Sequence, residues 1–107
     1  MSMSVLLATE KVMKELRHAE TKHPEWPADR LRQVVIVAEE AGEALRAALS
    51  IIENEEALVK NPPVGYDITL SHNKMARLEE ELEKEIAQTG AMALRWLQNR
   101  TPLYAQT

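Results

Sequence analysis

The chain has 107 residues, of which 45% are hydrophobic and 28% charged, and its formal net charge is −4. This length and composition suit a single domain over residues 1–107 and exclude intrinsic disorder as the main state. The absence of cysteine excludes disulfides, thiolate metal sites and cysteine nucleophiles. A negative chain without a lysine and arginine cluster is not expected to bind nucleic acid, whose affinity comes mostly from neutralised phosphates.

The first residues hold only one short apolar run, Val5 to Ala8. This run is too short for a signal-peptide core or a membrane span, so a soluble cytoplasmic protein without a membrane partner is expected. A chain of this size buries only ~65% of the surface that it exposes when unfolded. An oligomer that shares helix faces is therefore expected in place of a monomer.

Alanine, leucine and glutamate dominate, and no segment alternates with the period of two that a half-buried strand requires. Prolines interrupt the chain at residues 23–27, and a second break runs from residue 61 to about residue 72. The pattern predicts an all-α antiparallel helical bundle with helices at about 4–22, 29–60 and 73–99. The second of these is long, and a break near residues 52–56 would add a fourth helix.

Each predicted helix carries an apolar stripe at spacings of three and four. In the first helix the stripe consists of Val5, Leu6, Ala8, Val12, Met13, Leu16 and Ala19. In the second it consists of Leu31, Val34, Val35, Ala38, Ala41, Leu45, Ala48, Leu49 and Ile52, with further apolar residues beside it. The middle of this helix is therefore expected to be buried nearly all round. In the third helix the inward residues are predicted to be Met75, Leu78, Leu82, Ile86, Thr89, Ala93, Trp96 and Leu97.

Three glutamates interrupt residues 34–45, the most apolar stretch of the chain. Glu39, Glu40 and Glu43 lie on adjoining turns of one helix face. Like charges between apolar flanks repel one another unless protons or a cation neutralise them. The sequence therefore predicts a divalent cation at this face. An ordinary solvated face has the same spacing and is the alternative.

The third helix offers a second set of oxygen ligands. Glu85 falls on the predicted buried stripe, and Gln88 follows one turn later. Antiparallel packing would bring these two residues opposite Glu40 and Glu43, giving the all-oxygen set that Mg²⁺ or Mn²⁺ prefers.

Two glycines lie next to these acidic positions. Gly42 and Gly90 each cost the helix about 1 kcal/mol relative to alanine. They predict a close approach of helices, either beside the acidic site or as simple tight packing.

The two acidic segments resemble the motifs of the MazG-like, all-α nucleoside triphosphate pyrophosphohydrolases. Glu39-Glu40-Ala41-Gly42-Glu43 is similar to the Glu-Glu-x-x-Glu motif of that family, and Glu85-Ile86-Ala87-Gln88 is similar to its Glu-x-x-Asp motif. The likeness covers residues 34–49 and 79–98, and extends to the His-Pro-x-Trp-Pro run at 23–27. Gln88 stands where the family has its aspartate. Its amide oxygen can coordinate a cation but adds no charge.

The resemblance implies a four-helix MazG-like fold completed by assembly into a homodimer or homotetramer. It implies an enzyme that cleaves a nucleoside triphosphate into a monophosphate and pyrophosphate. Mg²⁺, or Mn²⁺ in its place, would be held by Glu40, Glu43, Glu85 and Gln88. Glu39 and Glu40 are then the catalytic residues, with Glu39 orienting or deprotonating the attacking water.

Three further residues are candidates for substrate contacts. Trp26, just before the acidic helix, either stacks on a base or anchors the start of that helix. Arg95, seven residues after Gln88, either contacts phosphate or pairs with a glutamate. Lys22 is a second cation for phosphate.

Two other functions remain open on the sequence. Because Gln88 lacks a charge, the second hypothesis is a helical module of the same fold that has lost catalysis but still binds nucleotide or metal. The third hypothesis is a helical bundle with a purely structural role.

Overall fold

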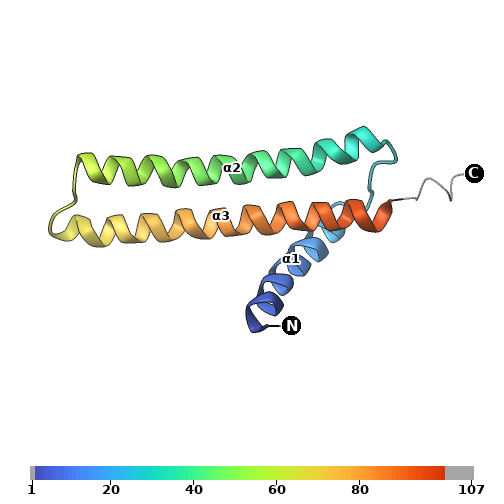
Figure 1. Ribbon diagram of the computed structural model, residues 1–107, viewed down its shortest axis with the longest axis horizontal. Coiled ribbons are helices and arrows are strands. Elements are labelled where there is room, and N and C mark those ends of the chain that lie inside the picture. The colour runs from blue at the N-terminus through green and yellow to red at the C-terminus, as the bar shows by residue number, and fades with distance from the viewer. Residues whose placement is uncertain (1, 101–107) are drawn as a thin grey trace, which may run out of the picture.

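The computed structural model describes residues 2–100 as three α-helices joined by two short connections (Figure 1). These are α1 (Met3–Lys22), α2 (Arg30–Lys60) and α3 (Tyr66–Asn99). The predicted all-α class is confirmed, and the described residues contain no strand. The expected break near residues 52–56 is absent, because α2 runs through it without interruption. None of the three helices has the run of apolar residues that a bilayer span requires.

Local residues explain where the helices begin. Ser2 and Asp29 cap α1 and α2, since a side-chain oxygen of each accepts a backbone N–H of the first turn. Gly65, at φ 58°, makes the left-handed turn that precedes α3. Because the turn is complete at Gly65, α3 begins at Tyr66, about two turns before the residue 73 that the sequence predicts. The interruption between α2 and α3 is therefore confined to residues 61–65.

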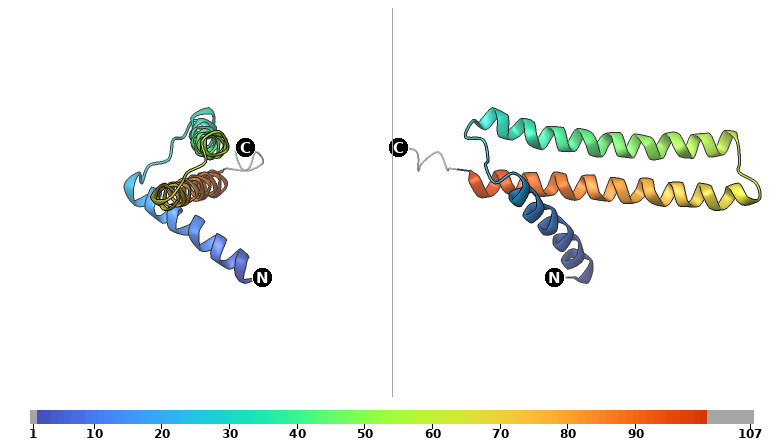
Figure 2. Two further views of the ribbon diagram at one scale, coloured as in Figure 1. Left: turned by 90° about the vertical axis from the view of Figure 1, so that its left-hand side faces the viewer. Right: turned by 180° about the vertical axis from the view of Figure 1, so that it is seen from behind.

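The two long helices form an antiparallel hairpin, with α2 and α3 side by side (Figures 1 and 2). Residues that are at least half-buried recur at alternating spacings of four and three on both helices, the spacing of a coiled coil. We call these positions the seam. On α2 the seam consists of Gln33, Val37, Glu40, Ala44, Ala47, Ile51, Asn54 and Leu58. On α3 it consists of Ser71, Met75, Leu78, Leu82, Glu85, Thr89, Met92 and Trp96.

Helix α1 packs obliquely against the C-terminal half of α3 (Figure 2). Gly90 allows this approach, because a Cβ built there would lie 3.3 Å from Cγ2 of Val12. The predicted close approach is therefore confirmed at Gly90. The prediction is wrong for Gly42 within this chain, since a Cβ built at Gly42 would meet no neighbouring atom within 4 Å. The buried cluster at the crossing consists of Leu16, Ala91 and Met92.

Much of the apolar surface that the sequence predicts to be buried is exposed in the single chain. Leu45 is 62% exposed, so the three helices of one chain do not provide the expected burial of α2 nearly all round. Ile86 and Leu97 are also more than half exposed, which corrects their predicted inward orientation. The physical reason is geometric: three helices in an elongated body of 67 × 31 × 24 Å cannot cover every side of one another.

Candidate metal centre

Two glutamates occupy the seam, where a helical hairpin normally places apolar residues. Glu40 comes from α2 and Glu85 from α3, and both are half-buried between the helices. Glu43 lies one turn after Glu40 at the exposed edge of the seam. The predicted juxtaposition of the two acidic segments is therefore found, and it follows from the heptad spacing on both helices.

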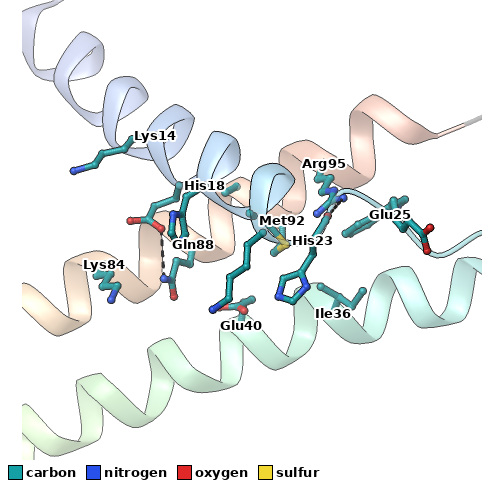
Figure 3. Close-up of a pocket in the computed structure, with 15 residues that line it drawn as sticks. Lys14, His18, His23, Glu25, Ile36, Glu40, Lys84, Gln88, Met92 and Arg95 are labelled. Carbon is teal, nitrogen blue, oxygen red and sulfur yellow. Dashed lines mark hydrogen bonds between the residues drawn. The ribbon is translucent and has the colours of Figure 1, made fainter.

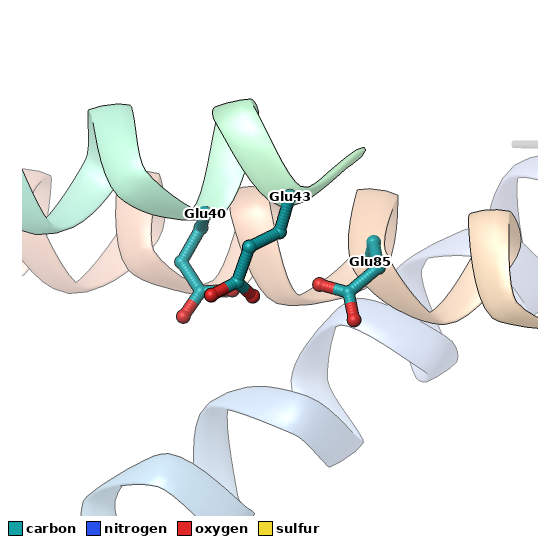
Figure 4. A group of neighbouring side chains, drawn as sticks. All are labelled: Glu40, Glu43 and Glu85. Carbon is teal, nitrogen blue, oxygen red and sulfur yellow. The ribbon is translucent and has the colours of Figure 1, made fainter. Parts of the chain in front are cut away.

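The three carboxylates converge on one point (Figure 4). Glu40, Glu43 and Glu85 each provide one oxygen, and these oxygens lie within 4.8 Å of one another. Oε2 of Glu40 and Oε2 of Glu85 are shielded from solvent, and neither atom has a hydrogen-bond partner among residues 2–100. Buried polar atoms of this kind are costly unless a ligand satisfies them.

Burial and mutual repulsion favour protonation of the cluster when no cation is bound. Burial raises the pKa of the Glu85 carboxyl to about 7, and the neighbouring Glu81 and Glu43 carboxyls, which can share a proton with it, add to this rise. Burial also raises the pKa of Glu40, with further contributions from the charges of Glu43, Glu39 and Glu15. These are the shifts that a divalent cation would reverse.

Within the described residues no basic side chain forms an ion pair with the three carboxylates. Among residues 2–100 the ion pairs are those between Lys11 and Glu83 and between Arg32 and Asp29, which both lie outside the cluster. A hard divalent cation fits this donor set, because it prefers carboxylate oxygens and would satisfy the two unpartnered atoms.

The other two predicted site residues, Glu39 and Gln88, lie on the same two helices as the three carboxylates. Glu39 is exposed on α2, beside Glu40. Gln88 is half-buried on α3, and its Nε2 donates a hydrogen bond of 3.4 Å to Oε2 of Glu15 on α1 (Figure 3). Glu15 is not among the site residues predicted from the sequence. No local pattern could identify it, because its partner lies 73 positions further along the chain.

A cavity of about 640 Å³ opens beside the cluster, between the three helices (Figure 3). Glu15, Glu40 and Gln88 line one part of it. The predicted substrate residues Lys22, Trp26 and Arg95 line the same cavity, together with Lys14, Lys84, His18 and His23. The cavity thus combines a group of acids with several basic side chains.

Arg95 is the most deeply buried cation of the cavity, at 4% exposure. One guanidinium nitrogen donates a 2.5 Å hydrogen bond to the carbonyl oxygen of His23, and the guanidinium lies over the Trp26 ring at 5.0 Å. Among the described residues no carboxylate pairs with Arg95, so the predicted ion pair is not formed. Trp26 packs against the core beneath Arg95, which favours its role as an anchor at the start of α2.

The residues of the site are the basis for its functional assignment. We compared the chain with protein-family models, with curated proteins and with solved structures, and none of the three comparisons found a match.

Proposed function

We propose that this protein is a Mg²⁺-dependent nucleotide pyrophosphohydrolase of the MazG-like class. The observation that carries the proposal is the pair of seam carboxylates, Glu40 and Glu85. Within residues 2–100 each has a buried Oε2 without a hydrogen-bond partner, and each provides one oxygen to the group that Glu43 completes within 4.8 Å. A structural bundle would gain stability from apolar residues at these positions. A cation-binding function explains why acids stand there.

In this proposal Glu40, Glu43 and Glu85 hold the cation, with the amide oxygen of Gln88 as a further donor. When bound, Mg²⁺ would neutralise part of the negative charge of the substrate and lower the pKa of a bound water molecule. Mn²⁺ would serve in the same way.

The basic side chains of the cavity bind the anionic end of the substrate. Arg95 and Lys22 line the cavity that also contains Glu40, so a polyphosphate can contact both the acids, through the cation, and these bases. Arg95 is held in place by Trp26 and by the His23 carbonyl, which reduces the conformational entropy lost on binding. A nucleoside triphosphate has the size and charge for such a cavity.

Hydrolysis between the α and β phosphates consumes one water and releases one proton. We assign Glu39 as the acceptor of this proton, because its carboxylate adjoins Glu40 on α2 but is not one of the three grouped ligands. Glu40 orients the reacting groups through its place in the cation site. The products are a nucleoside monophosphate and pyrophosphate.

We also propose that assembly completes a four-helix arrangement of the MazG-like type, as a homodimer or homotetramer. The apolar side chains exposed on α2 and α3 support this proposal, because one chain provides only three helices within residues 2–100.

A catalytically lapsed nucleotide- or metal-binding module is the second candidate. The observation that favours it is Gln88, whose neutral amide is hydrogen-bonded to Glu15 and adds no charge to the cation site. Such a protein would bind Mg²⁺ and nucleotide without turnover.

The test is pyrophosphate release from a panel of nucleoside triphosphates with Mg²⁺ or Mn²⁺. Glu40→Gln combined with Glu43→Gln should abolish release. The matched control, Glu53→Gln with Glu55→Gln, removes two exposed charges from the same helix and should leave it unchanged. Thermal stabilisation by Mg²⁺ and nucleotide without release would identify the lapsed module. Neither stabilisation nor release would refute both functions.

A further inference from the structure

One face of the α2–α3 hairpin is apolar, and the other helical segments of residues 2–100 do not cover it. On α2 it follows a second heptad repeat outside the seam, which we call the outer stripe: Leu31, Val34, Ala38, Ala41, Leu45, Ala48 and Ile52. An apolar groove of about 420 Å³ lies where this stripe meets Ala93 and Leu97 of α3. This groove shares no residue with the cavity beside the acidic cluster.

The outer stripe is an extended apolar surface. Leu31 is 71% exposed, Leu45 is 62% exposed, and Val34 and Ile52 are each about half exposed. Ile86 and Leu97 of α3, which are also more than half exposed, add to the same face. A contiguous apolar face of this kind marks an interaction site on a protein surface. The stripe runs along ~30 Å of α2, so a second helix can contact it over its whole length.

We propose that a second copy of this chain docks on the outer stripe, with its α2 antiparallel to the α2 of the first copy. This inference deepens the assembly part of the proposed function and does not depend on hydrolysis. In the antiparallel register Ala41 lies opposite the partner's Leu45, Ala38 opposite the partner's Ala48, and Val34 opposite the partner's Ile52. Two alanines then meet midway along each half of the interface, where they allow the two α2 helices to approach closely. The larger valine and isoleucine side chains meet at the two ends of the interface.

The charges beside the stripe favour the antiparallel direction. Arg30 flanks the stripe at the N-terminal end of α2, and Glu56 flanks it near the C-terminal end. Both side chains are exposed and neither has an ion-pair partner within residues 2–100. In the same register each Arg30 lies opposite the partner's Glu56, so the two-fold symmetry forms this pair twice. A parallel arrangement would place like charges together.

The first test is the molar mass of the full chain in solution, measured by light scattering and sedimentation equilibrium. We expect a dimer, or a higher multiple of it, at micromolar concentration. Leu45→Glu, in the centre of the stripe, should yield monomers. A wild-type chain that remains monomeric at about 100 µM would overturn the proposal, because stable interfaces of this size bind far more tightly.

Cysteine cross-linking tests the register in a chain that contains no cysteine of its own. Ala38→Cys combined with Ala48→Cys should give a covalent dimer on mild oxidation, since the two positions face each other across the interface. They are ~15 Å apart within one helix and cannot form an intrachain disulfide. Ala57→Cys, on α2 but outside the stripe, is the control and should not cross-link. This measurement remains decisive if Leu45→Glu fails to fold, and failure of the pair to cross-link would refute the proposed register.

Charge reversal tests the direction of pairing. Arg30→Glu should raise the dimer dissociation constant about tenfold, because two attractive pairs become repulsive. Adding Glu56→Arg should restore the wild-type value. Arg32→Glu, at an exposed position on another side of α2, should leave it unchanged. Loss of dimer in the double variant would contradict the antiparallel arrangement, whatever the outcome of the pyrophosphate assay.

Discussion

Glu85→Gln should stabilise the metal-free protein at neutral and alkaline pH while removing its response to Mg²⁺. In the wild-type protein without metal, folding brings the Glu85 carboxyl from water into the seam and raises its pKa from 4.5 to about 7. Between these pH values the folded chain binds more protons than the unfolded chain. The contribution of Glu85 to the free energy of unfolding is therefore fully present below about pH 4.5 and is lost as the pH rises to about 7.

The difference between a pKa of 4.5 and one of about 7 corresponds to ~3 kcal/mol at pH 8. Because Glu85 is only half-buried, water screens part of this cost, and we expect ~1–2 kcal/mol. Glutamine keeps the shape of the side chain without its charge. The variant should therefore melt about 5–10 °C higher than the wild type at pH 8, and about the same at pH 4.5.

Thermal unfolding in the presence of a chelator, at fixed chain concentration and at several pH values, measures this effect. Addition of Mg²⁺ should raise the melting temperature of the wild type, increasingly so as the pH rises, and should not raise that of Glu85→Gln. Glu80→Gln, at an exposed position on α3, is the control and should behave as the wild type in both conditions. An equal rise in both variants, or an unchanged pH dependence in Glu85→Gln, would refute the account of the seam carboxylates.

Three further outcomes are expected. Arg95→Gln should raise KM for a nucleoside triphosphate about tenfold and change kcat less, because it removes the buried cation that we propose as a phosphate contact. Steady-state kinetics with a parallel melting curve separates this effect from loss of fold. Asn54→Leu should stabilise the chain by ~1 kcal/mol in denaturant unfolding, because it replaces a seam amide whose Nδ2 is buried without a partner. Glu15→Gln should weaken Mn²⁺ binding in calorimetry by about tenfold. Adding Gln88→Asp to this variant should recover most of the lost affinity, because position 88 is hydrogen-bonded to position 15 and an aspartate there restores a carboxylate beside the cation site. Unchanged Mn²⁺ affinity in Glu15→Gln would show that α1 does not contribute to the cation site.

The sequence alone predicts the helices and the meeting of the two acidic segments because both depend on local spacing. Apolar residues at intervals of three and four identify the α2 and α3 faces, and the prolines limit the connections between helices. Once two such helices are antiparallel, Glu40 and Glu85 must share the seam. The same reasoning fails at Ile86 and Leu97, since periodicity shows that a residue lies on an apolar face but not which partner covers it.

Long-range features lie beyond what spacing can reveal. The position of α1 across α3 depends on the fit of Val12 over Gly90, and this crossing is what brings Glu15 to Gln88. The stacking of Arg95 on Trp26 is a second long-range feature. Arg95 could be chosen as a candidate from its charge and Trp26 from its place before the acidic helix, but neither a helix period nor a motif predicts that the two residues are in contact.

The polar residues of the seam connect the proposed site with the proposed assembly. Six of its sixteen positions are polar, and they are Gln33, Glu40, Asn54, Ser71, Glu85 and Thr89. Each reduces the apolar area that α2 and α3 bury against one another, so the hairpin alone has a small core. The outer stripe offers the missing apolar contact on a face that has no residue in common with the acidic cavity. A second copy can therefore supply stability without closing the cavity to substrate.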